Sequence, residues 1–389
     1  MISQQQANLF VLGKQHLTPG SRLEDVVRVA GDIGGLHATG ATTPYLSLWA
    51  RCPGFTRARL EVELYERHTL ARLRSVRGTI YIYPREFLPV AFAATSASVI
   101  ALSRRYMEAS GVTFEQYQRV SQDVLRLLAG REMTAVAIRQ ALQIDAYVPT
   151  VLNLMCDQGL LLRARPDKGW RDAHHRYARF SEYLPGVDLK QYSAGEASVE
   201  IVRQYLRSFG PAGEHDMAWW TGFTRSRVRT ALHELGGKVT EIELRGTERP
   251  WWLLSEEVEP LRQTRPAGAP TVNLLPGLDP YLMGYRERAR WLDEARAPWV
   301  FDRAGNATNV ILVDGRAAGV WDVAPTGEPG VKVFLFEDPP RQVLDTIQAE
   351  ARQLGRFILE RDVSVRQVRE MVPLPQRNAG GFMSPLREA

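Results

Sequence analysis

The sequence predicts an α+β protein built from three tandem winged helix-turn-helix units and a C-terminal β-rich cap. Short helical periods, separated by polar breaks and followed by strand-like runs, occur three times along the chain. After residue 265 the pattern changes to alternating strands with a hairpin signal. The length of 389 residues also exceeds what one ordinary core holds, so several structural units are expected.

The first unit is the least regular of the three. Helices are expected near residues 3–16, 23–34, 44–50 and 56–68. The alternating run TLARLRSVRGTIYIYP (69–84) then predicts a two-stranded wing that turns at Arg77–Gly78. Between the second and third helices stands GGLHAT (34–39), which looks like a helix end that carries two polar side chains.

The second and third units repeat one layout. Residues 133–164 contain two short helical periods and a strand that begins near Leu160. Residues 197–244 repeat this order, with TRSRVRTALHEL as the second helix and Gly236–Gly237 as its stop. Helix, turn, helix and hairpin is the winged-helix arrangement.

The C-terminal cap reads differently. NVILVDGRAAGVWDV (309–323) predicts a hairpin with a type I′ turn at Asp314–Gly315. VKVFLFED adds a strand, and RQVLDTIQAEARQLGRFI closes the chain with an amphipathic helix. The domains expected are a first winged helix with the candidate active-site motif, a second, a third, and the β-rich cap, at 1–112, 113–190, 191–265 and 266–389.

Composition points to a cytoplasmic protein. The first residues, MISQQQANLF, show no secretory signal, and Cys52 and Cys156 are too few and too far apart for a disulfide framework. The most apolar window (87–102) is interrupted by Pro89 and hydroxyl residues and reads as too short to span a bilayer, so no membrane is expected. Residues 1–194 carry 24 Lys and Arg against 17 Asp and Glu, which favours a polyanion on the first half.

Familiar catalytic motifs are missing from the sequence. There is no P-loop, no dinucleotide fingerprint, no GxSxG and no HExxH. The adjacent His174 and His175 are poorly placed for one metal ion, so no metal is expected.

Winged helices suggest DNA, since their second helix enters the major groove. Alternation places Arg72 and Arg74 on one face of a projecting wing, where they would contact phosphate. A second arginine set on TRSRVR is either a solvated face or a group of phosphate contacts. It consists of Arg225, Arg227 and Arg229.

Aromatic residues at helical spacing are interpreted mainly as core. Trp219 and Trp220 lie within a short amphipathic helix, and core packing is the simpler explanation than a base-stacking platform. Tyr45 and Trp49 are one helical turn apart. We expect Trp49 in the core and Tyr45 on the cleft.

Five motifs in order resemble a known family. GGLHATGATTPYLSLWAR, VRGTIYIYP, FGPAGEHDMAWWTG, LLPGLDPYLMGYRER and ILVDGRAAGVW together resemble the winged-helix DNA glycosylases of the AlkZ/YcaQ type, over roughly residues 5–370. The resemblance implies three winged helices that embrace DNA and excise bulky N7-alkylated purines or unhook interstrand crosslinks without metal or cofactor. It also implies self-resistance in producers of DNA-alkylating antibiotics.

The resemblance places the catalytic signature of the family at residues 37–39. The family has Gln, an apolar residue, then Gln or Asp, whereas this chain has His37, Ala38 and Thr39. An N7-alkylated base already carries positive charge and leaves neutral, so the enzyme must position water and stabilise charge on the sugar. A neutral His37 could accept a proton from water that Thr39 holds. Two alternatives are a structural His37 that caps the helix end, and lost catalysis with DNA binding retained.

Further residues are assigned to the DNA side by the resemblance. Arg77 and Thr79 would touch phosphate or the lesion, and Asp279 is either a remote carboxylate for the reaction or a turn residue before Pro280. The full set expected near the DNA, beyond Arg72 and Arg74 of the wing and the arginines of TRSRVR, is Tyr45, Arg51, Arg77, Thr79, Asp279, Tyr281, Tyr285 and Arg288.

The sequence therefore predicts a monofunctional DNA glycosylase for alkylated purines. It would act as a monomer on double-stranded, alkylated DNA, because three winged helices in one chain fit a protein that surrounds a single site. The alternatives are a non-catalytic DNA-binding protein, such as a lesion sensor or transcriptional regulator, and a protein-interaction module. A regulator would usually dimerise to read two half-sites.

Overall fold

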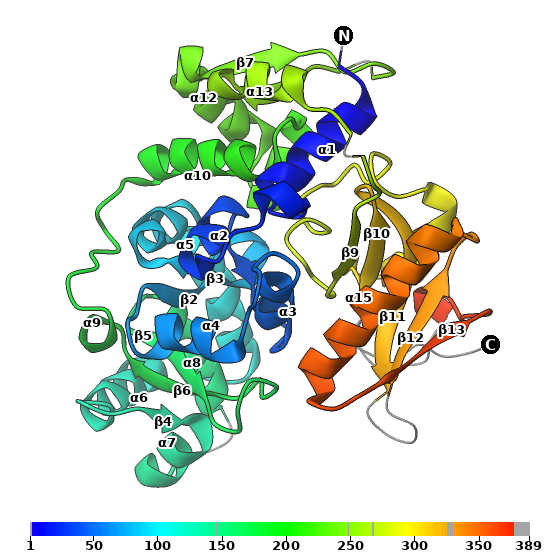
Figure 1. Ribbon diagram of the computed structural model, residues 1–389. Coiled ribbons are helices and arrows are strands. Elements are labelled where there is room, and N and C mark those ends of the chain that lie inside the picture. The colour runs from blue at the N-terminus through cyan, green and yellow to red at the C-terminus, as the bar shows by residue number, and fades with distance from the viewer. Residues whose placement is uncertain (1, 145–146, 248, 267, 325–329, 377–389) are drawn as a thin grey trace.

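The computed structural model describes residues 2–144, 147–247, 249–266, 268–324 and 330–376. Helices and strands alternate along these segments, which confirms the α+β class. Figure 1 shows the elements before β9 stacked in a column, with the C-terminal sheet and helix α15 beside it. Helix α1, from the start of the chain, lies between the upper part of the column and this C-terminal body.

The first unit contains the four expected helices and the expected wing. The helices are α1 (Gln4–Lys14), α2 (Val26–Asp32), α3 (Thr43–Trp49) and α4 (Arg57–Tyr65). The wing consists of β2 (Leu70–Arg74) and β3 (Ile80–Pro84), joined by the tight turn η2 (Val76–Gly78). A third strand, β1 (Leu36–His37), pairs with β3. The expectation that GGLHAT ends a helix is therefore wrong at His37.

Two helices follow for which the sequence analysis made no prediction: α5 (Leu88–Ala109) and α6 (Phe114–Leu127). The expectation of a short, interrupted apolar segment was wrong, since the helical stretch Arg85–Ala109 has the length and composition to cross a bilayer. That is weak evidence for a membrane span, because core helices pass the same test. Here α5 packs against α8 and α10.

The second unit has the expected pair of helices and strand. Its elements are β4 (Met133–Thr134), α7 (Ala135–Leu142), α8 (Val148–Asp157), β5 (Leu161–Pro166), β6 (His175–Arg179) and α9 (Phe180–Tyr183). Helix α8 lies against α5, and seven of its ten residues are buried. The face of α8 that remains open carries Thr150 and Asn153.

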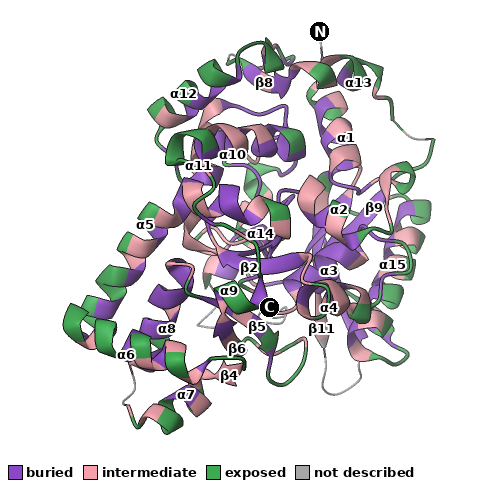
Figure 2. Ribbon diagram, turned by 90° about the vertical axis from the view of Figure 1, so that its left-hand side faces the viewer, coloured by how far each residue is buried: buried purple, intermediate pink, exposed green. Residues whose placement is uncertain are grey.

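The third unit is built on α10, which packs against helices of both the first and the third unit. The elements are α10 (Ala194–Phe209), α11 (Glu214–Thr221), α12 (Arg225–Leu235), β7 (Val239–Ile242), β8 (Trp251–Leu254) and α13 (Val258–Gln263). Helix α10 contacts α1, α5, α11 and α12. Its Tyr205 and Phe209 pack with Trp220 in the largest core cluster. Figure 2 shows this buried centre and the exposed far end of α5.

The C-terminal body is a five-stranded sheet covered by one long helix. Its elements are β9 (Val272–Leu275), α14 (Ala297–Val300), β10 (Val310–Val313), β11 (Arg316–Ala324), β12 (Gly330–Leu335), α15 (Arg341–Leu359) and β13 (Ser364–Val368). The strand order is β13-β12-β11-β10-β9. The predicted β10–β11 hairpin is confirmed, and Asp314 (φ 48°) and Gly315 (φ 76°) have the positive φ that a type I′ turn requires.

Candidate functional site

His37 is buried in the sheet of the first unit. It pairs with Tyr81 across β1 and β3, and the two rings lie 5.0 Å apart between centroids. Only 1% of His37 is exposed. Burial, with a smaller contribution from the charge of Arg77, lowers the pKa of His37 to about 3. The imidazole is therefore neutral at pH 7.

Two glycines explain how the chain reaches this position. Gly34 and Gly35 have φ of +79° and +93°, which favour glycine. A Cβ on Gly35 would lie 2.5 Å from Tyr83 Cε1, so any larger residue would clash with the second strand of the wing. The glycine pair lets the chain leave α2 and enter the sheet of the wing as the edge strand beside β3.

Thr39 follows His37 by two residues and is exposed. Its backbone N–H donates a long hydrogen bond to His37 Nδ1 (3.4 Å), so the proton of the neutral ring is on Nε2. Ala38 N–H donates to Ile80 O (2.8 Å), which fixes the segment against the wing. The two polar residues of the motif thus have different positions, one inside the fold and one on its surface.

A cationic pair lies on one side of the wing turn. Arg77, in the left-handed conformation (φ 53°), places its guanidinium carbon 3.9 Å from the centre of the Trp219 ring. Arg288 stacks on Phe301 at 3.3 Å and faces the same Trp219 ring at 5.9 Å. Neither arginine forms a salt bridge with any residue that the structure describes.

Burial weakens the protonation of both guanidiniums. It lowers the pKa of Arg77, and burial together with the neighbouring Arg77 charge lowers the pKa of Arg288 to about 10. Both groups remain charged at pH 7 and repel each other, and the charge of Asp302 offsets only part of the shift at Arg288. Such a pair is suited to bind an anion such as phosphate.

A groove of about 460 Å³ opens on the other side of the same turn. It lies between the wing, α5 and α8, and its floor includes Arg74. The lining residues are Thr39, Arg74, Gly78, Thr79, Ile80, Ser103, Tyr106, Ser110, Thr150, Asn153 and Arg163. The turn therefore separates a cationic side from a groove rich in hydroxyl groups.

Similarity to known proteins agrees with this arrangement. A family model described as DNA glycosylase AlkZ-like matches residues 30–357. The chain belongs to the AlkZ-like DNA glycosylase family. Members are DNA glycosylases, hydrolases that act on N-glycosyl bonds in DNA, so the resemblance predicted from the five motifs is confirmed.

Sequence and structure comparisons of this AlkZ-like glycosylase both lead to Streptomyces sahachiroi. A protein of Streptomyces sahachiroi named interstrand DNA cross-link repair glycosylase is 26% identical over 305 residues, covering 74% of this chain and 79% of the relative. The solved structure of Streptomyces sahachiroi DNA glycosylase AlkZ has a TM-score of 0.77, with 21% identity, covering 94% of this chain and 99% of that one. At that identity the structural match shows a shared fold.

The wing arginines of this glycosylase do not project, contrary to the sequence prediction. Arg72 is 8% exposed and donates to Tyr65 Oη (2.8 Å), because β2 packs against the second unit at β5. Arg74 donates to Gly78 O (2.7 Å) and Asp157 Oδ2 (3.0 Å). Both guanidiniums therefore hold the fold together, and a phosphate contact by Arg72 was wrong.

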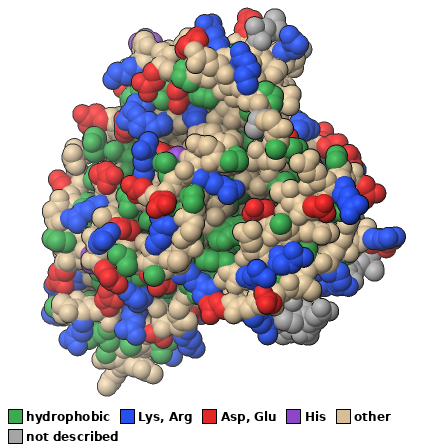
Figure 3. All heavy atoms as spheres, in the orientation of Figure 1, with side chains coloured by type: hydrophobic (Ala, Val, Ile, Leu, Met, Phe, Trp, Pro, Cys, Tyr) green, Lys and Arg blue, Asp and Glu red, His purple; other side chains and the backbone are tan. Residues whose placement is uncertain are grey.

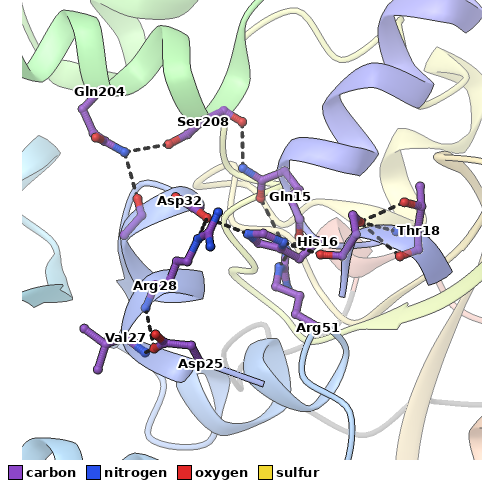
Figure 4. A network of polar contacts seen from close by, with 12 residues as sticks. Gln15, His16, Thr18, Asp25, Val27, Arg28, Asp32, Arg51, Gln204 and Ser208 are labelled. Atoms are coloured by element: carbon purple, nitrogen blue, oxygen red, sulfur yellow. Dashed lines mark hydrogen bonds and ion pairs between the residues drawn. The ribbon is translucent and has the colours of Figure 1, made fainter. Parts of the chain in front are cut away.

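Arg51 and Asp279 are also interior residues, so their assignment to the DNA surface was wrong. They form a two-pronged ion pair at 2.7 and 2.8 Å, and both side chains are 0% exposed. Arg51 Nε also donates to Gln15 O (2.9 Å), and Figure 4 shows Arg51 beside Gln15, which in turn reaches Ser208 of α10. Ser47 Oγ donates to Asp279 (2.6 Å). Asp279 is thus neither a free carboxylate for the reaction nor merely a turn residue.

The tyrosines expected near the DNA are buried as well. Tyr281 Oη donates to Gly315 O (2.9 Å) and Tyr285 Oη to Phe209 O (2.8 Å), and both rings are at most 1% exposed. Tyr45 is 1% exposed and packs edge-on against Trp170, whereas Trp49 is only partly buried. The prediction that Tyr45 lies on the cleft was therefore wrong, whereas Trp49 packs against three core clusters, as expected.

The three arginines of α12 differ in exposure. Arg225 and Arg229 are exposed, and Arg229 pairs with Glu214 (2.8 Å). Arg227 turns inward and donates to Ser198 Oγ (2.9 Å) and Ala94 O (3.0 Å), so it is not available to phosphate. Figure 3 shows Lys and Arg interspersed with Asp and Glu over one face of the molecule.

Sequence reasoning missed two parts of the site. Trp219 was interpreted as core, but it is only partly buried and carries Arg77 on its ring. The groove residues Tyr106, Thr150 and Asn153 were not considered, because the apolar pattern of α5 and α8 draws attention to their buried faces. The available signal was the polar and aromatic residues at the positions of α5 and α8 that are not part of the apolar pattern.

Proposed function

We propose that this chain is a monofunctional DNA glycosylase that hydrolyses the N-glycosidic bond of N7-alkylated purines, including bulky adducts or crosslinks, in double-stranded DNA. The observation that carries the proposal is the position of Thr39. Its exposed side chain lines the groove beside the wing turn, and Arg77 of the same turn carries a guanidinium that is stacked on Trp219. The cross-link repair named for the Streptomyces relative supports a bulky substrate.

The DNA would lie with one phosphate against Arg77 and Arg288. Both guanidiniums are stacked on aromatic rings, which holds their planes in place. Arg288 Nη2 donates to Gly305 O (3.2 Å), and the other N–H groups of the pair are left for an anion. Arg225 and Arg229, exposed on α12, would contact the backbone farther along. We infer three winged helices over 1–112, 113–190 and 191–265, a cap from 266 onward, and a cytoplasmic monomer that surrounds one site.

In the reaction, water oxygen bonds to the anomeric carbon while the C–N bond breaks. The bonding electron pair goes to the base, whose ring cation becomes a neutral leaving group, and the proton released by water passes to solvent. Thr39 Oγ1 accepts a hydrogen bond from this water and holds it on the sugar. His37, neutral and buried, fixes the backbone of Thr39, and it acts as a positioning residue rather than as a proton acceptor.

A second candidate function is a lesion sensor without catalysis. The burial of His37 favours it, since a 1% exposed ring with a pKa near 3 is a poor general base. The same arginines would bind the damaged duplex in both cases. The two functions differ only in whether a base is released.

The test is release of labelled 7-methylguanine, and of a bulkier N7-alkylguanine, from duplex DNA in single turnover. Wild type should release base, and Thr39→Val should lower the rate by about 10²-fold because the water loses its partner. His174→Gln is the matched control, since His174 is exposed and lies outside the site. Binding without release would favour the sensor, and equal release by Thr39→Val would remove the role of Thr39.

The role of His37 has its own test. His37→Leu should slow release, whereas His37→Gln, which keeps a side-chain acceptor, should restore most of it. The rate of wild type should not follow a pKa near 6.5 between pH 5.5 and 8.5, because His37 stays neutral throughout. A rate that falls tenfold per unit below pH 6.5, and does so only when His37 is present, would show that it accepts a proton.

A further inference from the structure

We propose that the groove between the wing, α5 and α8 holds the alkylated nucleobase itself, turned out of the duplex and stacked on Tyr106; this inference rests on the proposed function. The groove is lined both by Thr39 and by Tyr106, which lies near the C-terminal end of α5 and is 61% exposed. Its volume of about 460 Å³ is within the range of pockets that enclose small organic molecules.

The charged groups of the groove are already engaged with each other. Arg74 donates to Gly78 O, Ser103 Oγ (2.7 Å) and Asp157 Oδ2. Arg163 Nη2 donates to Asn153 Oδ1 (2.6 Å). Arg74 thus pairs with a carboxylate and Arg163 with an amide oxygen, whereas neither Arg77 nor Arg288 has a salt bridge among the residues that the structure describes. The groove is therefore suited to a flat group with hydrogen-bonding edges rather than to the anionic DNA backbone.

Neutral donors and acceptors surround the space instead. Because Arg163 occupies the oxygen of Asn153, the amide N–H₂ of that residue is left to donate to a ligand. Thr150 stands one turn away on the same open face of α8, and Thr79 lines the opposite wall. Hydroxyl and amide groups on two walls can read the edge of a base, and the exposed Tyr106 ring can stack on its face.

The wing turn divides the nucleotide between two sites. Arg77 faces Trp219 on one side, whereas Gly78 and Thr79 line the groove on the other. A nucleotide placed across the turn would put its phosphate on Arg77 and its base in the groove. The bond between base and sugar would then lie at Thr39, where water is proposed to be held.

The floor of the groove would also favour departure of the base. Arg74 and Arg163 bring two positive charges, and the Asp157 carboxyl beneath them brings at most one negative charge. As the bond breaks, positive charge moves from the ring of the base to the sugar. A net positive floor disfavours the cationic bound base relative to the neutral base that leaves.

The experiment measures binding of free 7-methylguanine by equilibrium dialysis, which needs no turnover. Wild type should bind the base, Tyr106→Ala should weaken binding about 5- to 100-fold, and Tyr106→Phe should retain it. Thr150→Val should also weaken binding, because it removes a hydrogen bond to the edge of the base, while the base still stacks on Tyr106. Phe114→Ala is the matched control, since Phe114 is 50% exposed on α6 and lies outside the groove.

Two outcomes would overturn the inference. The first is a wild-type protein that releases base from DNA but does not bind free 7-methylguanine, or binds it equally well after Tyr106→Ala. The second is a loss of affinity for undamaged duplex in Tyr106→Ala equal to the loss for the free base, which would place backbone in the groove. A protein that binds the base but releases none from DNA would instead contradict the proposed function and leave this site supported.

Discussion

The Arg51–Asp279 pair offers the clearest test of how the site is held. Arg51→Met removes a guanidinium that donates to both carboxylate oxygens, and leaves Asp279 charged at 0% exposure. Ser47 Oγ and Tyr281 N–H still donate to Asp279, but no cation replaces Arg51. Breaking a buried pair by removing one partner costs about 3–5 kcal/mol, and this pair joins the end of α3 to the C-terminal body.

The assay is urea unfolding of Arg51→Met, Asp279→Leu and the double variant. The double variant should recover part of the loss, because no uncompensated charge remains. Arg67→Met is the matched control, since Arg67 is 68% exposed and its pair with Glu63 should contribute less than about 1 kcal/mol. A loss below about 1 kcal/mol for Arg51→Met would refute the reasoning. Reduced DNA affinity of a fully folded Arg51→Met protein would also refute it, because Arg51 would then act on the DNA rather than on the fold.

Three further predictions follow from the site. The unfolded chain protonates His37 below pH 6.5, whereas the folded protein does so only near pH 3. The free energy of unfolding should therefore fall by about 2 kcal/mol between pH 6.5 and 5. His37→Gln should remove this pH dependence in unfolding experiments. Arg77→Gln or Arg288→Gln should each lower duplex affinity and reduce the slope of its logarithm against log salt by about 1, unlike Arg67→Gln; an unchanged slope would exclude phosphate contact. Gly35→Ala should cost more free energy of unfolding than Gly54→Ala, because only Gly35 meets Tyr83 at 2.5 Å; equal costs would contradict the clash.

Local chemistry made several elements predictable. The type I′ hairpin at Asp314–Gly315 follows from the preference of those residues for positive φ, and the helices of the second and third units follow from their apolar periodicity. Five ordered motifs also identified the AlkZ-like family, which a family model over 30–357 confirms. The position of the motif His37–Thr39 came from the same resemblance.

Burial could not be predicted, because it depends on contacts between segments far apart in sequence. Arg51 and Asp279 are 228 positions apart, and nothing local to either residue shows that each is the partner of the other. Arg72 points into the molecule only because β5 covers the wing, while Arg77, three residues past Arg74, reaches Trp219 because the turn reverses the chain.

The sequence by itself therefore determined the family, the α+β class and where along the chain the motif lies. The tertiary structure alone decided which polar side chains reach the surface. It placed His37 inside with a lowered pKa and Thr39 outside, and it brought Thr39 and Tyr106 to the lining of one groove. The physical reason is that the cost of burying a charge or a ring nitrogen is offset by partners that only the folded chain brings together.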